Sequence, residues 1–226
     1  NYIINGYGGQ IVLIDDWIEG TVTISNNYFD LVHNGTTKYG RTVSTVKNQN
    51  GTIERPIVIS NNTMDVAEGS GITIKGIATH VNISFNTFKV TQGAIEIDGE
   101  ECSYIDIHDN YIFRNFPWAY LGDELVIDNA GADNHIIWDH NYYMDYNETG
   151  SYEIVNNLFG QSKEITNTDS IPIRPDDTDG DGLDDILEEH GLGTDPNNVD
   201  TDGDGIPDGF EYTTYLEQHS RYYLNP

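Results

Sequence analysis

The sequence predicts an all-β chain, a right-handed, single-stranded parallel β-helix followed by a small acidic tail with short helical turns. Three observations support this prediction: a short register that recurs over residues 22–159, an Asn at the same place in every copy, and two acidic loops of identical spacing near the C-terminus. Repetition at a fixed register is typical of solenoids, because each repeat buries its apolar side chains only against its neighbours.

The six copies of the register share an apolar alternation and a fixed Asn. They read VTISNNYF, IVISNNTM, VNISFNTF, YIDIHDNYI, IIWDHNYY and YEIVNNLF. In each copy two apolar residues flank a polar one, as in Val22 and Ile24, which is the period-two pattern of a strand with one buried face. The Asn comes three residues after the second apolar position, and a large apolar residue follows two positions later. The aligned residues are Asn27, Asn62, Asn86, Asn110, Asn141 and Asn157.

A second, weaker apolar alternation precedes most copies, so each coil offers at least two short strands. It comprises residues 12–14, an imperfect match near Val46, and residues 72–74, 95–97 and 125–127. The aligned Asn residues lie 35, 24, 24, 31 and 16 positions apart. The first four intervals fit a coil of about two dozen residues with surface loops of variable length. The last interval is too short for a coil, so we expect the final copy to end the solenoid.

The repeated Asn is expected at one corner of each coil. Asn tolerates left-handed backbone geometry, and its side-chain amide can bond to the Asn of the coils above and below, which forms a ladder along the solenoid. A β-sandwich has turn signals at similar intervals, but it gives no reason for a fixed offset between the Asn and the following apolar residue.

The signature I-x-I-x-x-N-x-F, over about residues 10–160, resembles the parallel β-helix repeat family, the pectin-lyase-like proteins. That family includes pectate lyases, alginate lyases and many archaeal and bacterial surface proteins. The resemblance implies the fold and leaves the function open, because the same scaffold carries lyases, hydrolases, adhesins and passive surface components.

The chain is strongly acidic. Ten Lys and Arg residues face 38 Asp and Glu residues, which gives a net charge of -28 over 226 residues. This charge argues against nucleic acid or an anionic membrane as a partner and favours cations. Residues 176–226 hold 15 acidic residues and one Arg. No stretch reaches the roughly 18 to 20 apolar residues of a membrane span.

Two matched acidic loops, 23 residues apart, follow the Pro-containing segment 171–175. Positions 1, 3, 5, 6, 9 and 12 hold Asp177, Asp179, Asp181, Gly182, Asp185 and Glu188 in the first loop, and Asp200, Asp202, Asp204, Gly205, Asp208 and Glu211 in the second. These are the offsets of an EF-hand-type calcium loop. Between the loops, residues 186–190 predict a short helical turn that ends at Gly191.

Calcium explains this spacing because it takes six to eight hard oxygen ligands. Alternate carboxylates, the backbone carbonyl at position 7 (Leu183 or Ile206) and the Glu at position 12 supply them, position 9 acts through water, and Gly at position 6 permits a sharp turn. The carboxylates repel one another, so the tail is predicted to order only with bound metal. Magnesium fits poorly because it prefers octahedral geometry and retained water.

The two loops resemble the thrombospondin type 3 and dockerin-like calcium repeats, which are common as stiff stalks in secreted microbial proteins. The resemblance implies calcium as the bound ion and a secreted or cell-surface location. We therefore divide the chain into a parallel β-helix (residues 1–170), a linker (171–176) and a calcium-binding tail (177–226).

The alignment of coils also yields weak catalytic candidates. It places Lys75, Asp98 and Asp128 in one outer column, where a lyase of the resembled family would need a basic residue and a hydrolase would need paired carboxylates. Only Lys75 is basic there, and solvated surface charges are common in so acidic a chain. A second column sets His108 beside Asp139 and Asp109 beside His140, as a metal site or as hydrogen-bonded surface groups.

We therefore expect a secreted, calcium-binding cell-surface protein that acts as a structural, sheath or filament subunit and not as an enzyme. Its partners would be calcium ions and either further copies of the chain or other surface proteins. A polysaccharide-binding adhesin, and a polysaccharide lyase or glycoside hydrolase, are the alternatives.

Overall fold

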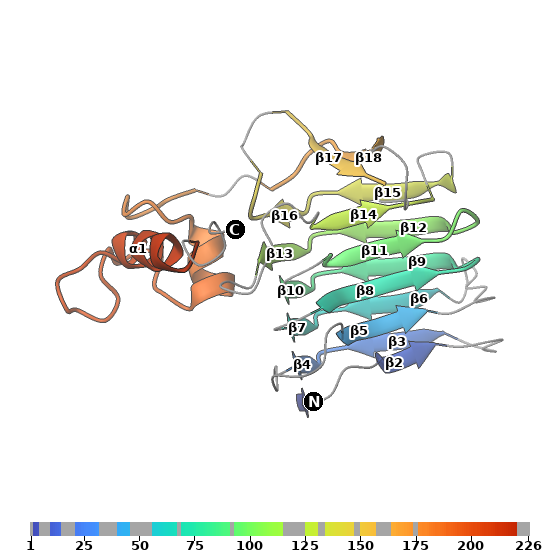
Figure 1. Cartoon of the computed structure of the whole chain (residues 1–226), viewed down its shortest axis with the longest axis horizontal. Helices are drawn as coiled ribbons and strands as arrows, with labels where there is room; N and C mark the ends of the chain where they lie inside the picture. The colour runs from blue at the N-terminus through green and yellow to red at the C-terminus, as the bar shows by residue number, and fades with distance from the viewer. Residues whose placement is uncertain are drawn as a thin grey trace. The chain divides into compact units, whose positions relative to one another are not determined.

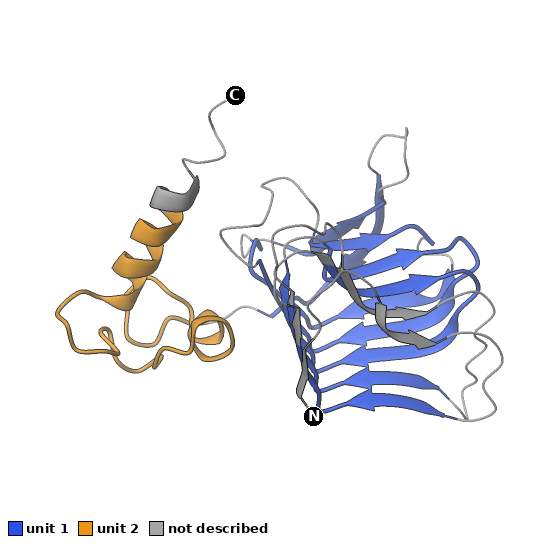
Figure 2. Ribbon diagram, turned by 60° about the horizontal axis from the view of Figure 1, so that its bottom comes forward, with its two compact units in different colours: residues 1–115, 119–173 blue, residues 116–118, 174–226 orange. Residues whose placement is uncertain are grey.

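The computed structural model describes residues 2–4, 10–14, 21–31, 40–45, 56–66, 69–90, 93–114, 125–130, 134–146, 150–156, 164–173 and 176–220. The chain divides into two compact units, coloured separately in Figure 2. Unit 1 comprises residues 1–115 and 119–173, and unit 2 comprises residues 116–118 and 174–226.

Three sheets of stacked strands build unit 1 (Figure 1). Sheet A contains β1 (Tyr2–Ile4), β4 (Tyr28–Leu31), β7 (Thr63–Val66), β10 (Thr87–Val90), β13 (Tyr111–Arg114) and β16 (Tyr142–Tyr143). Sheet B contains β2 (Gln10–Ile14), β5 (Gly40–Thr45), β8 (Gly69–Lys75), β11 (Ile95–Asp98), β14 (Val126–Asp128), β17 (Tyr152–Val155) and β18 (Ile165–Asp169). Sheet C contains β3 (Val22–Ser25), β6 (Ile57–Ser60), β9 (Thr79–Ser84), β12 (Ser103–His108) and β15 (Ile136–Asp139).

Consecutive strands pass from sheet B to sheet C to sheet A, and each coil pairs in parallel with the next. The prediction of an all-β parallel β-helix is confirmed. Parallel neighbours suit this chain because short strands stacked at about 4.8 Å satisfy one another's backbone groups along the whole solenoid.

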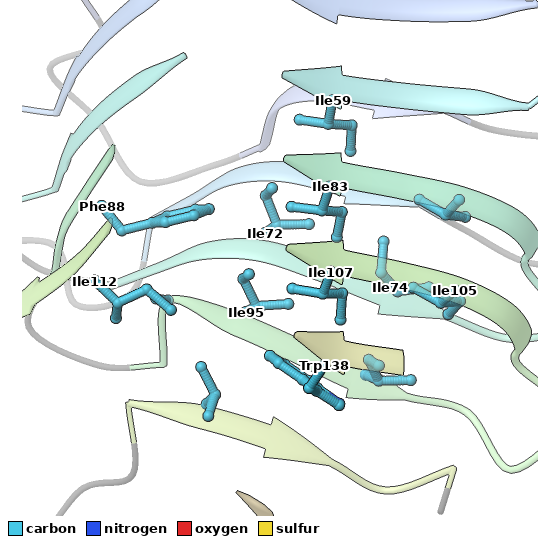
Figure 3. Close-up of a cluster of buried hydrophobic side chains, with 14 of the residues drawn as sticks. Ile59, Ile72, Ile74, Ile83, Phe88, Ile95, Ile105, Ile107, Ile112 and Trp138 are labelled. Carbon is cyan, nitrogen blue, oxygen red and sulfur yellow. The ribbon is translucent and has the colours of Figure 1, made fainter. Parts of the chain in front are cut away.

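Columns of inward side chains form the core. Ile59, Ile83, Ile107 and Trp138 occupy one column of sheet C in register, and Figure 3 shows them stacked from coil to coil. All four are buried. Burying an Ile side chain contributes roughly 1.5–3 kcal/mol, so each added coil extends a core that no single coil could form.

Each coil has a third strand, which the apolar alternation in the sequence did not distinguish from the corner at the repeated Asn. It lies in sheet A and begins directly after the repeated Asn, as β10 begins after Asn86. The large apolar residue expected after the Asn is the inward residue of this strand. Phe88 is an example, since it is fully buried and pairs with Met64 and Ile112 of the adjacent coils.

One alignment of the weaker alternation is wrong. In β14 the partner of Ile95 is Val126, and not Leu125 as the alignment predicted. A loop of variable length separates these two copies, so counting residues could not set the register. The imperfect match near Val46 corresponds to β5, in which Val43 pairs with Val12; Val46 itself lies outside the described residues.

The predicted ladder of Asn side chains is confirmed. The backbone N–H and Nδ2 of Asn62 both donate to Oδ1 of Asn86, at 3.0 and 2.9 Å. Nδ2 of Asn62 also donates to the backbone carbonyl of Ser60 at 3.0 Å and to that of Ile24 in the preceding coil at 2.9 Å. The same pair of bonds to the next member recurs at Asn27, Asn86, Asn110 and Asn141.

The left-handed backbone lies one residue before the ladder Asn, and not at it as expected. The residues with φ between +52° and +56° at this corner are Asn26, Asn61, Phe85, Asp109 and His140. The chain therefore separates the two demands of the corner: one residue turns the backbone, and the next directs its amide along the solenoid.

Asp169 takes the sixth place in the ladder. Its Oδ2 accepts hydrogen bonds from the backbone N–H and Nδ2 of Asn141, at 2.9 and 3.1 Å. Asn157, the expected sixth member, lies outside the described residues. The last sequence copy forms β17, which pairs with β14 in parallel and with β18 antiparallel in sheet B. That copy ends the parallel stacking, as predicted, but in a different sheet from the other five.

Unit 2 contains a π-helical turn, η2 (Leu187–Leu192), and the helix α1 (Asp208–Ser220). The turn expected to stop at Gly191 continues through it and ends at Gly193. Gly193 has φ of +85°, and its N–H donates to the Glu188 carbonyl at 2.6 Å. Within the described residues, neither helix combines the length and the hydropathy needed to cross a membrane.

Candidate calcium-binding loops

The side chain at position 1 folds each loop around itself. Oδ1 and Oδ2 of Asp177 accept from the N–H groups of Gly180 and Gly182, at 2.8 and 3.2 Å. In the second loop Asp200 accepts from the glycines at the same two positions, at 2.9 and 2.8 Å. Short polar side chains readily bond to backbone N–H groups a few residues ahead, so this local chemistry places successive carboxylates on the inside of a tight turn.

Glycine is required at two positions of each loop. Gly182 and Gly205, at position 6, have φ of +99° and +95°. Gly180 and Gly203, at position 4, also have positive φ, of +78° and +75°. The glycines at position 4 were not singled out from the sequence, although the repeated D-x-D-G-D-G pattern contains them. Any other residue at these positions would strain the backbone.

The folded loops bring three groups of carboxylates together. Ligand atoms of each group lie within 4.8 Å of one another, and the groups are Asp177, Asp179 and Asp181; Asp200, Asp202 and Asp204; and Asp181, Glu188 and Asp208. Among the described residues, Asp185 and Glu211 belong to no such group. The predicted ligand role of the Leu183 and Ile206 carbonyls stays a prediction.

The two predicted position-9 residues hold their own loops closed. Asp185 accepts hydrogen bonds from the N–H and Oγ1 of Thr178, at 2.8 and 2.6 Å. Asp208 accepts from the N–H of Thr201, at 3.1 and 3.2 Å to its two oxygens. Each side chain thus ties position 9 to position 2 and closes the loop across the ligand cluster.

A cation fits the first loop because two of its buried oxygens have no other partner. Oδ2 of Asp179 and Oε2 of Glu188 are buried and make no hydrogen bond among the described residues. A buried carboxylate oxygen without a donor is costly, and a bound hard cation is the partner that offsets this cost.

Mutual repulsion in the loops also favours a cation. Burial, together with the negative charges of Asp179 and Asp181, raises the pKa of the Glu188 carboxyl to about 7, although the hydrogen bond from Thr194 acts to lower it. Desolvation and the charge of Asp204 raise the pKa of Glu211 as well. Like charges held this close destabilise one another unless a positive ion lies between them.

The expected catalytic column does not extend across three coils. Lys75 and Asp98 are in register, and Nζ of Lys75 lies 3.1 Å from Oδ2 of Asp98 in an ion pair near the surface. Asp128, however, pairs with Ile97 and is fully buried. Because neighbouring strand residues face opposite sides, this one-residue shift moves Asp128 from the outer face to the interior, where the N–H of Ala130 donates to it.

The His–Asp column has the expected register and forms a hydrogen-bonded surface group. His108 is the strand partner of Asp139. Asp109 accepts from Nδ1 of His108 at 2.8 Å and contacts Nδ1 of His140 at 2.6 Å, so one carboxylate links two coils. Among the described residues, the clusters of side chains close enough to share a metal ion all lie in unit 2.

An aromatic column, half-buried at His80 and exposed at Tyr104 and His135, lies at the opposite edge of sheet C and was not expected from the sequence. The rings of His80, Tyr104 and His135 stack with centroids 4.9 and 4.8 Å apart. All three residues have φ near +55°, so the corner between sheets B and C repeats the left-handed turn of the Asn corner. This column is hard to recognise in the sequence, because the residue type differs from coil to coil and only the strand register aligns the three residues.

The chain thus combines a parallel β-helix with a pair of acidic loops whose carboxylates lie close enough to share a cation. Residues 177–199 and 200–214 match the model of the bacterial TSP3 repeat family, a calcium-binding repeat typical of extracellular proteins. The chain is similar to that family over these two segments. No curated protein and no solved structure matches the chain.

Proposed function

We propose that both acidic loops bind calcium and that the chain acts outside the cell as a structural, sheath or filament subunit. The observation that carries this proposal is the pair of unpartnered buried oxygens, on Asp179 and Glu188, inside loops that match a calcium-binding repeat. The proposed ligands are Asp177, Asp179, Asp181, Leu183, Asp185 and Glu188 in the first loop and Asp200, Asp202, Asp204, Ile206, Asp208 and Glu211 in the second.

Titration calorimetry of the full chain tests calcium binding. We expect calcium to bind with a Kd of about 1 mM or tighter, as in extracellular calcium modules, and magnesium to bind at least about tenfold more weakly, because the loops offer many flexible oxygen ligands. Asp177→Asn with Asp200→Asn removes position 1 from both loops and should abolish the calcium heat. Equal affinity for the two ions, or binding unchanged in the double variant, would contradict the proposal.

The structural role is proposed from the build of unit 1. Its core and its Asn ladder run through the stacked coils, so the solenoid can resist load along its length. A structural role of this kind requires no catalytic group. Self-association is tested by light scattering and electron microscopy of the chain with and without calcium. Filaments or defined oligomers with calcium support the subunit role, and a monomer under both conditions contradicts it.

A second candidate function is polysaccharide adhesion, and the outer side of sheet C favours it. Tyr104, Phe85 and Ile137 are each more than half exposed there, at 52, 51 and 56 %. Aromatic side chains combine an apolar surface with polar edges, which suits sugar rings. Glycan-array binding that is lost in Tyr104→Ala and kept in Tyr111→Ala, a tyrosine on sheet A, would support adhesion.

A further inference from the structure

Asp208 belongs to the second loop by sequence but lies with ligands of the first. One oxygen each of Asp181, Glu188 and Asp208 lies within 4.8 Å of the others, a separation that a single cation can span. Asp200, Asp202 and Asp204 of the second loop form their own group, without Asp208. The two loops are therefore unequal, although their spacing is identical.

The start of helix α1 is held against the first loop. The N–H of Gly209 donates to Oδ2 of Asp181 at 2.7 Å. A Cβ atom on Gly209 would lie 2.3 Å from the backbone oxygen of Asp181, so only glycine permits this approach. The first loop has Ile186 at the same position, 10. Because a side chain there prevents an equally close approach, the second loop contacts the first in this way and the first does not contact the second in the same way. The positive end of α1 also favours the Asp181 carboxylate.

Glu188 provides an independent indication that a cation belongs in this group. Its side chain is fully buried, and its Oε2 has no hydrogen-bond partner among the described residues. Oε1 accepts from Thr194 at 3.2 Å, so the side chain is fixed with its free oxygen available. Asp208 is also buried. Three converging carboxylates, two of them buried, need a positive partner.

We propose that Asp208, which its spacing assigns to the ion of its own loop, is instead a ligand of the calcium ion held by the first loop, so that this site is complete only when the second loop is folded against it. The inference rests on the proposed calcium binding and adds how the two loops are coupled. The first site includes two buried carboxylates and a ligand from each loop, whereas the second site uses half-buried and exposed side chains of one loop. Calcium in the first site therefore also fixes the start of α1.

The test uses the full chain with the second loop disabled by Asp200→Asn and Asp202→Asn, so that calorimetry reports the first site alone. Adding Asp208→Asn to this background should weaken calcium binding at least about tenfold, because one charged ligand is lost while an acceptor for Thr201 remains. Adding Glu189→Gln instead is the charge-matched control. Glu189 is exposed and outside all three groups, so its change should be less than about twofold.

The reciprocal background carries Asp177→Asn and Asp179→Asn, which disable the first site, so that calorimetry reports calcium binding at the second site alone. Asp208→Asn should affect calcium binding less here than in the first background. A larger effect here, or no effect in the first background, overturns the proposal. A third calcium ion in the unmodified chain also overturns it, since the group would then be a separate site.

Gly209→Ala gives a second, independent measurement. It should weaken the first site by displacing α1 from Asp181 while every carboxylate remains, and an unchanged affinity counts against the coupling. If the unmodified chain binds no calcium at all, the proposed function itself fails. The two failures are therefore distinguishable.

Discussion

Asp169 closes the Asn ladder because a carboxylate only accepts hydrogen bonds. Every ladder amide donates toward its C-terminal neighbour, so the last member receives donors. Asp169 is fully buried. Its Oδ1 accepts hydrogen bonds from the N–H groups of His140 and Ile171, at 3.1 and 3.2 Å, and its Oδ2 accepts from Asn141. The substitution of acid for amide at this one place follows from the direction of the ladder.

Asp169→Asn should therefore destabilise the solenoid, although the same residue type fills the other places. An Asn here would direct two N–H donors toward groups that are already donors, and an unsatisfied buried polar group costs about 1–3 kcal/mol. Urea unfolding at constant calcium measures the loss. Asp106→Asn, at an exposed position of β12, is the control and should cost less than about 0.5 kcal/mol. Equal costs would refute this account of the ladder end.

Asp109 makes a pH-dependent contribution to stability. Burial acts to raise the pKa of its carboxyl, but the hydrogen bonds and charges of His108 and His140 outweigh burial and hold the pKa below its ordinary 3.8. A lowered folded-state pKa means that the stabilisation is present above 3.8 and is lost as the pH falls through the folded value.

The measurement is the difference in unfolding free energy between the unmodified chain and Asp109→Asn over a pH series. We expect about 0.5–1 kcal/mol near pH 7, because the group lies near the surface. The difference should shrink as the pH falls below 3.8. A difference that stays constant to the lowest pH would show that charge plays no part.

Among the structural elements, the corner between sheets C and A imposes the same backbone demand on every coil. One residue per coil turns with φ near +55°, and Asn26 and Asn61 meet this demand with a residue that tolerates it. Phe85 occupies the same position in β9's coil with a bulky side chain that is 51 % exposed. Its contact with His108, with ring centroids 5.7 Å apart, offsets part of the strain.

Phe85→Asn should stabilise the chain by about 0.5–1 kcal/mol, because it relieves a left-handed strain of roughly 1–2 kcal/mol and loses a partly exposed ring. Thermal and urea unfolding measure the gain. Phe85→Leu keeps the strain and should give none. Both variants lose the ring contact with His108, so if the Asn variant is no more stable than the Leu variant, the left-handed backbone carries no strain that Asn relieves.

At the scale of the molecule, the two units depend on different forces. Apolar columns and backbone pairing hold unit 1 together, whereas clustered carboxylates dominate the described part of unit 2. Desolvation and, after it, this crowding raise the pKa values of Glu188 and Glu211. Removal of calcium should therefore affect unit 2 selectively.

Limited proteolysis with mass spectrometry measures this selectivity. In a chelator we expect cleavage within residues 176–220 and survival of a fragment that contains unit 1, because the uncompensated carboxylates repel one another. With calcium the tail should resist cleavage at the same protease concentration. Equal resistance in both conditions would mean that the loops order without an ion.

Local patterns in the sequence predicted much of this architecture. Alternation and the repeated Asn identified the strands of sheet C and the ladder, because both repeat at short, constant offsets. The D-x-D-G-D-G spacing identified the loop carboxylates for the same reason. Variable loops hid the register of β14, so Asp128 was assigned to the wrong face.

Contacts between distant segments required the tertiary structure. Asp169 reaches the ladder from an antiparallel strand that follows no repeat, and Asp208 meets Asp181 and Glu188 only because Gly209 lets α1 approach the first loop. Short-range periodicity records which face each residue presents. It carries no information about which distant backbone comes within hydrogen-bonding distance, since packing of the whole chain decides that.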